Sequence, residues 1–192
     1  QSESWDARAR AMASKGAWFL APDNLVGPNL YVAASHQQVV VFGILPMLST
    51  GLEAEYARIR VTTASAGSFI RSCLYRYEGR DGLQKFVKVP ASEALFSGAS
   101  TGVKTVKLAD TATLNAGEAY FLGAYVSDGS VALTSDTFTG SRIMTAKVLS
   151  QTLGSSSERL PSTVAVSSLV SNATTRIPFV IYMSRTAADV FD

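Results

Sequence analysis

The stretch from residue 56 to residue 126 constrains the fold more than any other part of the chain. It begins with an alternating pattern, in which Ile59, Val61 and Thr63 are expected on one face of the strand and Arg58, Arg60 and Thr62 on the other. This period of two is typical of a half-buried strand. A turn of small residues at 64–67 precedes a second predicted strand over 68–77, and Asp81-Gly82 then suits a tight hairpin turn.

The second half of this stretch repeats the strand-and-turn pattern. Residues 118–126 form a nearly continuous apolar run that follows a turn at 114–117 and precedes another at Asp128-Gly129. A run of this length between turn residues is typical of a strand that is covered on both faces. Together the two halves predict an antiparallel, all-β domain, which for this chain we expect to be a β-sandwich.

Composition supports this fold class and excludes several functions. Ala, Ser, Thr, Gly and Val dominate the 192 residues, which favours sheets over a helical bundle. The net charge is only +2, so no basic surface for nucleic acid is predicted. No apolar run approaches the length of about 18 residues that a membrane span needs, so we expect no membrane insertion. The single cysteine, Cys73, excludes an intrachain disulfide and suggests assembly in a reducing cytoplasm.

The N-terminal segment has a different pattern. Residues 1–15 place Trp5 and Met12 on one face at helical spacing, which predicts a short helix or arm. Such a segment needs a partner surface, either in its own domain or in a neighbour. We therefore expect an N-terminal unit over 1–29 and a β-sandwich domain over 30–192. The side chains of Trp5, Met12 and Trp18 are candidate assembly contacts. The chain begins without an initiator Met, which indicates a processed product or a piece of a longer chain.

Residues suited to catalysis or metal binding are sparse. His36 is the only histidine, and a Gly-x-Ser-x-Gly elbow is missing, so a Ser-His-Asp triad is not predicted. One Cys and one His do not make a zinc site, and the spacing of the carboxylates does not pair them as a glycosidase requires. We expect no catalytic residues and no cofactor. Calcium is the one ion left open, with Asp128 and Asp136 as candidate ligands, although a turn role explains them as well.

Aromatic and arginine side chains are the candidates for binding sugars. A flat ring stacks on a pyranose face, while neighbouring polar groups bind hydroxyls. Tyr75 and Tyr77 share one face of the second predicted strand with Arg71. We expect Tyr75 in the core, and we take Tyr77, Arg71 and Arg80 as candidate glycan-binding residues. The later aromatics, Tyr120, Phe121 and Tyr125, are expected in the core.

The order of these elements resembles a known family. The matching residues are Thr63-Ala64, Arg71, Leu74-Tyr75, Asp81-Gly82, Gly102, Lys104, Leu114, Gly117, Tyr120 and Leu122, after a lead-in at Asn29-Leu30-Tyr31. In this order they resemble the jelly-roll modules of bacteriophage tail fibres and tailspikes. The resemblance covers roughly residues 30–133, with the strand near 177–183 as a further candidate element. Cys73 departs from the pattern, in which glycine is more common.

This resemblance implies a jelly-roll fold and a role in a virion. The family has no fixed catalytic motif, so the expected function is non-enzymatic binding of a host-surface glycan or receptor, by a homotrimer that folds in the bacterial cytoplasm. One alternative is a structural virion protein of the capsid, neck or tail that binds other virion proteins. Another is a carbohydrate-binding module cut from a cellular enzyme. The position of exposed aromatics discriminates these roles: a concave cluster favours glycan binding, and a flat one favours assembly.

Overall fold

A computed structural model gives the fold of the chain. It describes residues 17–19, 29–31, 39–44, 51–79, 84–137, 147–149, 153–171, 176–178 and 180–185, with side chains for 51–79, 84–134, 153–169 and 180–185. The predicted N-terminal helix at 1–15, His36 and the Asp81-Gly82 turn lie outside these residues. None of the helices in the described part of the chain is long and apolar enough to cross a membrane.

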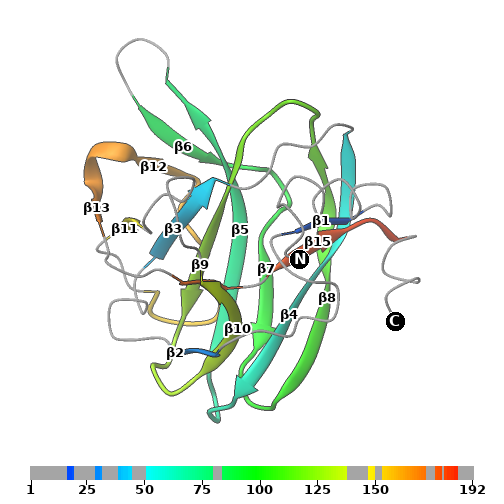
Figure 1. Cartoon of the computed structure of the whole chain (residues 1–192), viewed down its shortest axis with the longest axis vertical. Helices are drawn as coiled ribbons and strands as arrows, with labels where there is room; N and C mark the ends of the chain where they lie inside the picture. The colour runs from blue at the N-terminus through cyan, green and yellow to red at the C-terminus, as the bar shows by residue number, and fades with distance from the viewer. Residues whose placement is uncertain are drawn as a thin grey trace.

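The described strands form two antiparallel sheets (Figure 1). The first sheet contains β1 (Ala17–Phe19), β2 (Asn29–Tyr31), β4 (Leu52–Thr63), β8 (Gly102–Leu114), β10 (Ala132–Thr137), β14 (Arg176–Pro178) and β15 (Ile181–Met183). The second contains β3 (Val39–Ile44), β5 (Phe69–Glu78), β6 (Lys85–Lys88), β7 (Ala94–Ser97), β9 (Tyr120–Val126), β11 (Lys147–Leu149), β12 (Thr163–Ala165) and β13 (Leu169–Ser171). A short 3-10 turn, η2 (Val166–Ser168), joins β12 to β13.

The pairing order is that of a jelly roll. In the first sheet β2 pairs with β10, β10 with β4, and β4 with β8. In the second, β3 pairs with β9, β9 with β5, and β5 with both β6 and β7. From β2 to β10 the chain changes sheet at every connection except those between β5, β6 and β7. This alternation closes two Greek keys around one core and confirms the predicted fold class.

The main core lies between the two sheets. β4 supplies Ile59 and Val61, which are almost fully buried, while Arg60 between them is half-exposed. This is the predicted alternation, with one difference. Arg58 is also buried, and its Nε donates a hydrogen bond to Thr105 Oγ1 of β8 (2.8 Å). This bond satisfies one of the hydrogen-bond donors of the buried guanidinium, which would otherwise be costly to remove from water.

A polar contact also links the two sheets inside the core. The hydroxyl of Tyr182, on β15, lies 3.0 Å from Ser72 Oγ on β5 and donates to the backbone oxygen of Ser92 (2.9 Å). Burial raises the pKa of this tyrosine well above its usual range. Because a buried hydroxyl without a partner is costly, these bonds favour one alignment of β15 against the second sheet.

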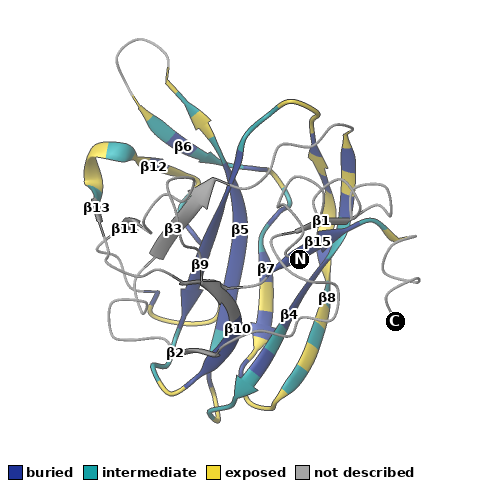
Figure 2. Ribbon diagram, in the orientation of Figure 1, coloured by how far each residue is buried: buried dark blue, intermediate teal, exposed yellow. Residues whose placement is uncertain are grey.

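The outer face of the second sheet is covered by the chain itself. Every residue of β9 is buried, and β5 is buried from Ile70 to Tyr75 (Figure 2). On the outer side, a second apolar cluster joins Cys73, Tyr75, Phe86, Phe121 and Tyr125 of the sheet to Leu153, Leu160 and Val164. Tyr75, Tyr120, Phe121 and Tyr125 are therefore all buried, as predicted. The returning segment over 153–165 therefore buries the outer face of these strands, as the first sheet buries the inner face.

Cys73 in this outer cluster is expected to be unreactive until the chain unfolds. Its side chain is fully buried, and burial raises the pKa of the thiol far above the usual range. A thiol reagent needs the exposed thiolate, so labelling in native buffer should be at least about a thousandfold slower than in urea. Mass spectrometry reports a single product because the chain has one cysteine. Equal labelling rates in both solvents would contradict the burial of Cys73.

Candidate functional site

An open groove lies on the outer face of the second sheet. It has a volume of about 550 Å³ and forms where the beginning of β5 and the strand β7 meet the segment 154–156. It is lined by Gly67, Ser68, Phe69, Leu95, Phe96, Ser97, Ala99, Gly154, Ser155 and Ser156. Leu95 is 42% exposed, which makes it one of the large apolar side chains that solvent reaches.

Backbone hydrogen bonds hold the floor of the groove together. Ser65 N donates to Gly98 O (2.9 Å), and Gly98 N donates to Ser68 O (3.0 Å). The close approach requires a glycine at position 98, since a Cβ there would overlap the Ser68 hydroxyl and lie 3.3 Å from Ile70 Cδ1. The turn at 65–68 and the loop after β7 are therefore joined as one surface.

A buried ion cluster fixes the wall of the groove. Glu93, with a side chain that is 5% exposed, binds Arg71 Nη1 through Oε2 (2.5 Å) and Lys88 Nζ through Oε1 (2.7 Å). Arg71 Nη2 donates to the backbone oxygen of Ser156 (2.5 Å). Lys88 Nζ donates to the backbone oxygen of Leu160 (2.9 Å). These bonds tie the segment 154–160 to β5, because the charged groups need partners once they are removed from water.

The lining combines apolar surface with hydroxyl groups and contains no charged side chain. Leu95 and the half-buried ring of Phe69 supply the apolar part. The exposed Ser97, Ser155 and Ser156 supply hydroxyls, whereas Ser68 is buried and its hydroxyl donates to Ser65 O (2.6 Å). Such a surface can pack against the carbon face of a ligand and exchange hydrogen bonds with its hydroxyls. It offers no group of the kind that general acid-base chemistry uses.

The predicted glycan-binding residues are only partly brought together. Tyr77 and Arg71 share the outer face of β5, as predicted, and Tyr77 is 45% exposed with its ring edge-on to Phe86 (centroids 6.0 Å apart). Arg71 is 7% exposed, and its guanidinium is bound to Glu93 and Ser156. Tyr77 lies eight residues along β5 from Phe69, about 26 Å from the groove at strand spacing. Of the two, Tyr77 is the one that solvent reaches.

Several predicted residues lie outside the described part of the chain. They are Arg80 of the glycan set and Trp5 and Met12 of the assembly set. Trp18 is described only as backbone, where it pairs with Tyr182 between β1 and β15. The predicted roles of these side chains stay predictions.

Sequence reasoning missed Leu95 and Ser97. In the sequence, residues 91–97 are compatible with both a short strand and a turn of helix, so the pattern assigns neither face. The structure makes Ala94–Ser97 the strand β7, with Ala94 and Phe96 buried and Leu95 and Ser97 exposed. The alternation was present in the sequence, but four residues are too few for period alone to separate a strand from a helical turn.

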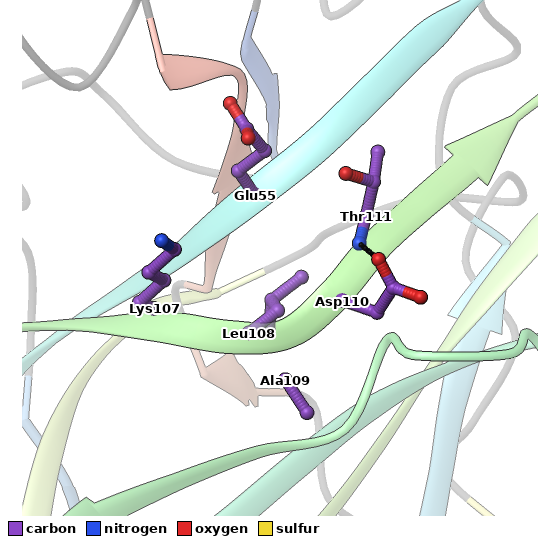
Figure 3. Close-up of a pocket in the computed structure, with 6 residues that line it drawn as sticks. All are labelled: Glu55, Lys107, Leu108, Ala109, Asp110 and Thr111. Carbon is purple, nitrogen blue, oxygen red and sulfur yellow. Dashed lines mark hydrogen bonds between the residues drawn. The ribbon is translucent and has the colours of Figure 1, made fainter.

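A second, smaller hollow of about 180 Å³ lies between β4 and β8 (Figure 3). Ala54 pairs with Ala112 and Tyr56 with Lys107, so residues 108–111 bulge opposite Glu55. Figure 3 shows the side chains of Glu55 and Lys107 projecting to the same side of the strands. The carboxylate of Asp110 accepts a hydrogen bond from Thr111 N (2.8 Å) within the bulge. The bulge shapes an edge strand, as bulges commonly do.

The calcium prediction concerns Asp128 and Asp136. The Asp128 carboxylate accepts hydrogen bonds from Ser65 Oγ (2.5 Å) and Ser130 N (2.8 Å), and the bond from Ser65 is the main reason that its pKa lies below the usual range. This is a turn role. The side chain of Asp136 lies outside the described set, within which no three His, Cys, Asp or Glu residues form a group able to hold a metal ion. Calcium binding stays a prediction.

Comparison with known proteins adds no family to these observations. No family model matches the chain, and no curated protein sequence matches it. A function can therefore only be proposed from the order of the strands and the chemistry of the groove.

Proposed function

We propose that this chain is a non-enzymatic module of a bacteriophage virion, in a tail fibre or related appendage, and that it binds a host-surface glycan in the groove beside β7. The observation that carries the proposal is the lining of that groove, in which the apolar Leu95 and Phe69 lie next to serine hydroxyls. A sugar presents the same combination of an apolar carbon face and peripheral hydroxyls. The jelly-roll order of the strands, together with the motifs that resemble phage appendage modules, supports the location.

We expect the affinity for a glycan-bearing surface to come from several copies of the groove that bind at once. An open groove without charged ligand-binding groups makes few strong contacts, so a single site is expected to bind weakly. Several copies on one particle raise the effective concentration of the remaining sites once the first has bound. A homotrimer, as expected from the family resemblance, would carry three grooves. The protein would act on the virion after folding in the bacterial cytoplasm.

Leu95→Asp tests the groove as the glycan contact. The substitution removes the apolar contact and adds a carboxylate that a bound sugar would desolvate, so binding to an immobilised panel of bacterial surface glycans should fall at least about tenfold. Val103→Asp is the matched control, since Val103 is 50% exposed but lies on β8 of the other sheet. Circular dichroism and thermal unfolding should show that both variants keep the fold.

Three outcomes separate the possibilities. Loss of binding in Leu95→Asp alone supports the groove. Equal binding by both variants and the wild type means that glycan binds elsewhere, and Tyr77→Ala then tests the exposed ring at the other end of β5. Failure of the wild-type chain to bind any glycan of the panel, even when displayed on beads in many copies, would overturn the proposal.

A structural virion role is the second candidate, and one observation favours it. Within the described residues the 13-residue strand β8 pairs with β4 alone, so its other edge presents backbone donors and acceptors beside the exposed Val103. An edge of this kind can accept a strand from a neighbouring protein. Light scattering of the purified chain, with and without residues 1–15, would test self-assembly.

A further inference from the structure

We infer that the groove selects neutral saccharides and excludes acidic ones. This inference rests on the proposed function and specifies the ligand class for the same site. It depends on the hydrogen bonds and ion pairs that the charged side chains near the groove already make, because these bonds decide which charged atoms a ligand could still reach.

The first step concerns cations. An acidic sugar carries a carboxylate, sulfate or phosphate, and such groups are usually bound by Arg, Lys or a pair of backbone N–H groups. Arg71 is the guanidinium beneath the groove wall, but Nη1 binds Glu93 and Nη2 binds the backbone oxygen of Ser156. Its side chain is 8% exposed. Lys88 of the same cluster donates to Glu93 and to Leu160 O. Arg71 Nε has no hydrogen-bond partner within the described residues, but this atom is buried, so both cations are held in the wall rather than presented to a ligand.

The second step concerns anions near the same wall. Glu158, which lies within the segment 154–160, accepts a hydrogen bond at Oε2 from Gly154 N (2.8 Å). That backbone N–H is therefore used by a carboxylate of the chain itself, while the neighbouring Arg159 is exposed, so this loop carries one charge of each sign. An anionic sugar would lose its hydration and gain no cation from the groove lining itself. A neutral sugar loses only hydroxyl hydration, which the serine hydroxyls and backbone can replace.

The test compares matched oligosaccharides on one array. The probes are neutral oligosaccharides of hexose and N-acetylhexosamine, and the same structures extended by sialic acid, uronic acid or sulfate. We expect neutral probes to bind and the matched acidic probes to bind at least about tenfold more weakly. Binding to neutral probes should change less than about twofold between low and high salt, because no ion pair is formed.

Ser97→Arg provides a gain of function in the same groove. Ser97 is exposed and lines the groove, so an arginine there places a free cation beside the ligand. The variant should gain binding to acidic probes, and that binding should weaken as salt is added. Thr113→Arg is the control, since Thr113 is exposed on β8 and is not part of the groove. It should leave the preference unchanged.

The outcomes distinguish this inference from the proposed function. A wild-type chain that prefers acidic probes, with affinity that falls as salt rises, would overturn the inference and leave glycan binding intact. Equal binding of neutral and acidic probes would also overturn it. A chain that binds no probe of either kind would overturn the proposed function and the inference together.

Discussion

Glu93→Gln is expected to lower the free energy of unfolding by about 3 kcal/mol, because it leaves two buried or half-buried cations without an anion. The carboxylate of Glu93 binds both Arg71 and Lys88, and Oε2 also accepts a hydrogen bond from Leu160 N (3.3 Å). The amide of Gln has nearly the same shape, so the loss reports charge rather than volume. Urea unfolding followed by circular dichroism measures it.

The control for this substitution is Glu78→Gln. Glu78 also pairs with an arginine, but its ion pair with Arg76 spans 3.7 Å and both side chains are at least 30% exposed. An exposed pair of this kind contributes little, so the change in stability should stay within about 0.5 kcal/mol. Similar losses in the two variants would mean that the Glu93 cluster is no more important than a surface pair. Hydrogen exchange at Leu160 N should also rise in Glu93→Gln alone.

Gly123→Ala is expected to cost about 1–3 kcal/mol through overpacking. Gly123 lies on β9 opposite Cys73 of β5, and the Tyr75 ring lies over it. A Cβ at position 123 would overlap that ring and lie 3.0 Å from Cys73 Sγ. The ring has little freedom to move, because Tyr75 is fully buried and its hydroxyl donates to Pro161 O (2.8 Å). Urea unfolding of the variant measures the loss.

A double-mutant cycle identifies the cause of that loss. In a Tyr75→Leu background the ring that overlaps the new methyl group is missing, so Gly123→Ala should cost clearly less than in the wild type. The difference between the two costs is the coupling between positions 75 and 123. A coupling of zero would show that the cost arises elsewhere in β9.

The ion cluster and the groove belong to one arrangement. Arg71 was expected to bind a ligand, and the structure instead uses it to hold Ser156 in the wall. If Glu93→Gln loosens the segment 154–160, glycan binding in the groove should weaken along with stability. The charged residues then shape the site without touching the ligand, which is consistent with the neutral lining.

Local pattern was enough to predict much of the fold. The alternation at Ile59 and Val61, the apolar run of β9 and the turns at 64–67 and Asp128-Gly129 all depend on neighbours in the chain. A period of two and turn residues with suitable φ act over a few positions, so they can be read without knowing the partner strands. Burial of Tyr75 followed from the same reasoning, since it lies in the middle of a strand rich in aromatic and branched residues.

The antiparallel β class, the approximate strands and the aromatic core could thus be predicted from local pattern alone. The groove and the cluster that supports it could not, because they form between segments that are far apart in the chain. Arg71, Glu93 and Ser156 are joined because β5 pairs with β7 and because the chain later returns over the outer face of that sheet. These contacts span 22 and 85 positions. Periodicity carries no information at such separations, so Arg71 had the same sequence pattern whether it faced a ligand or a buried glutamate.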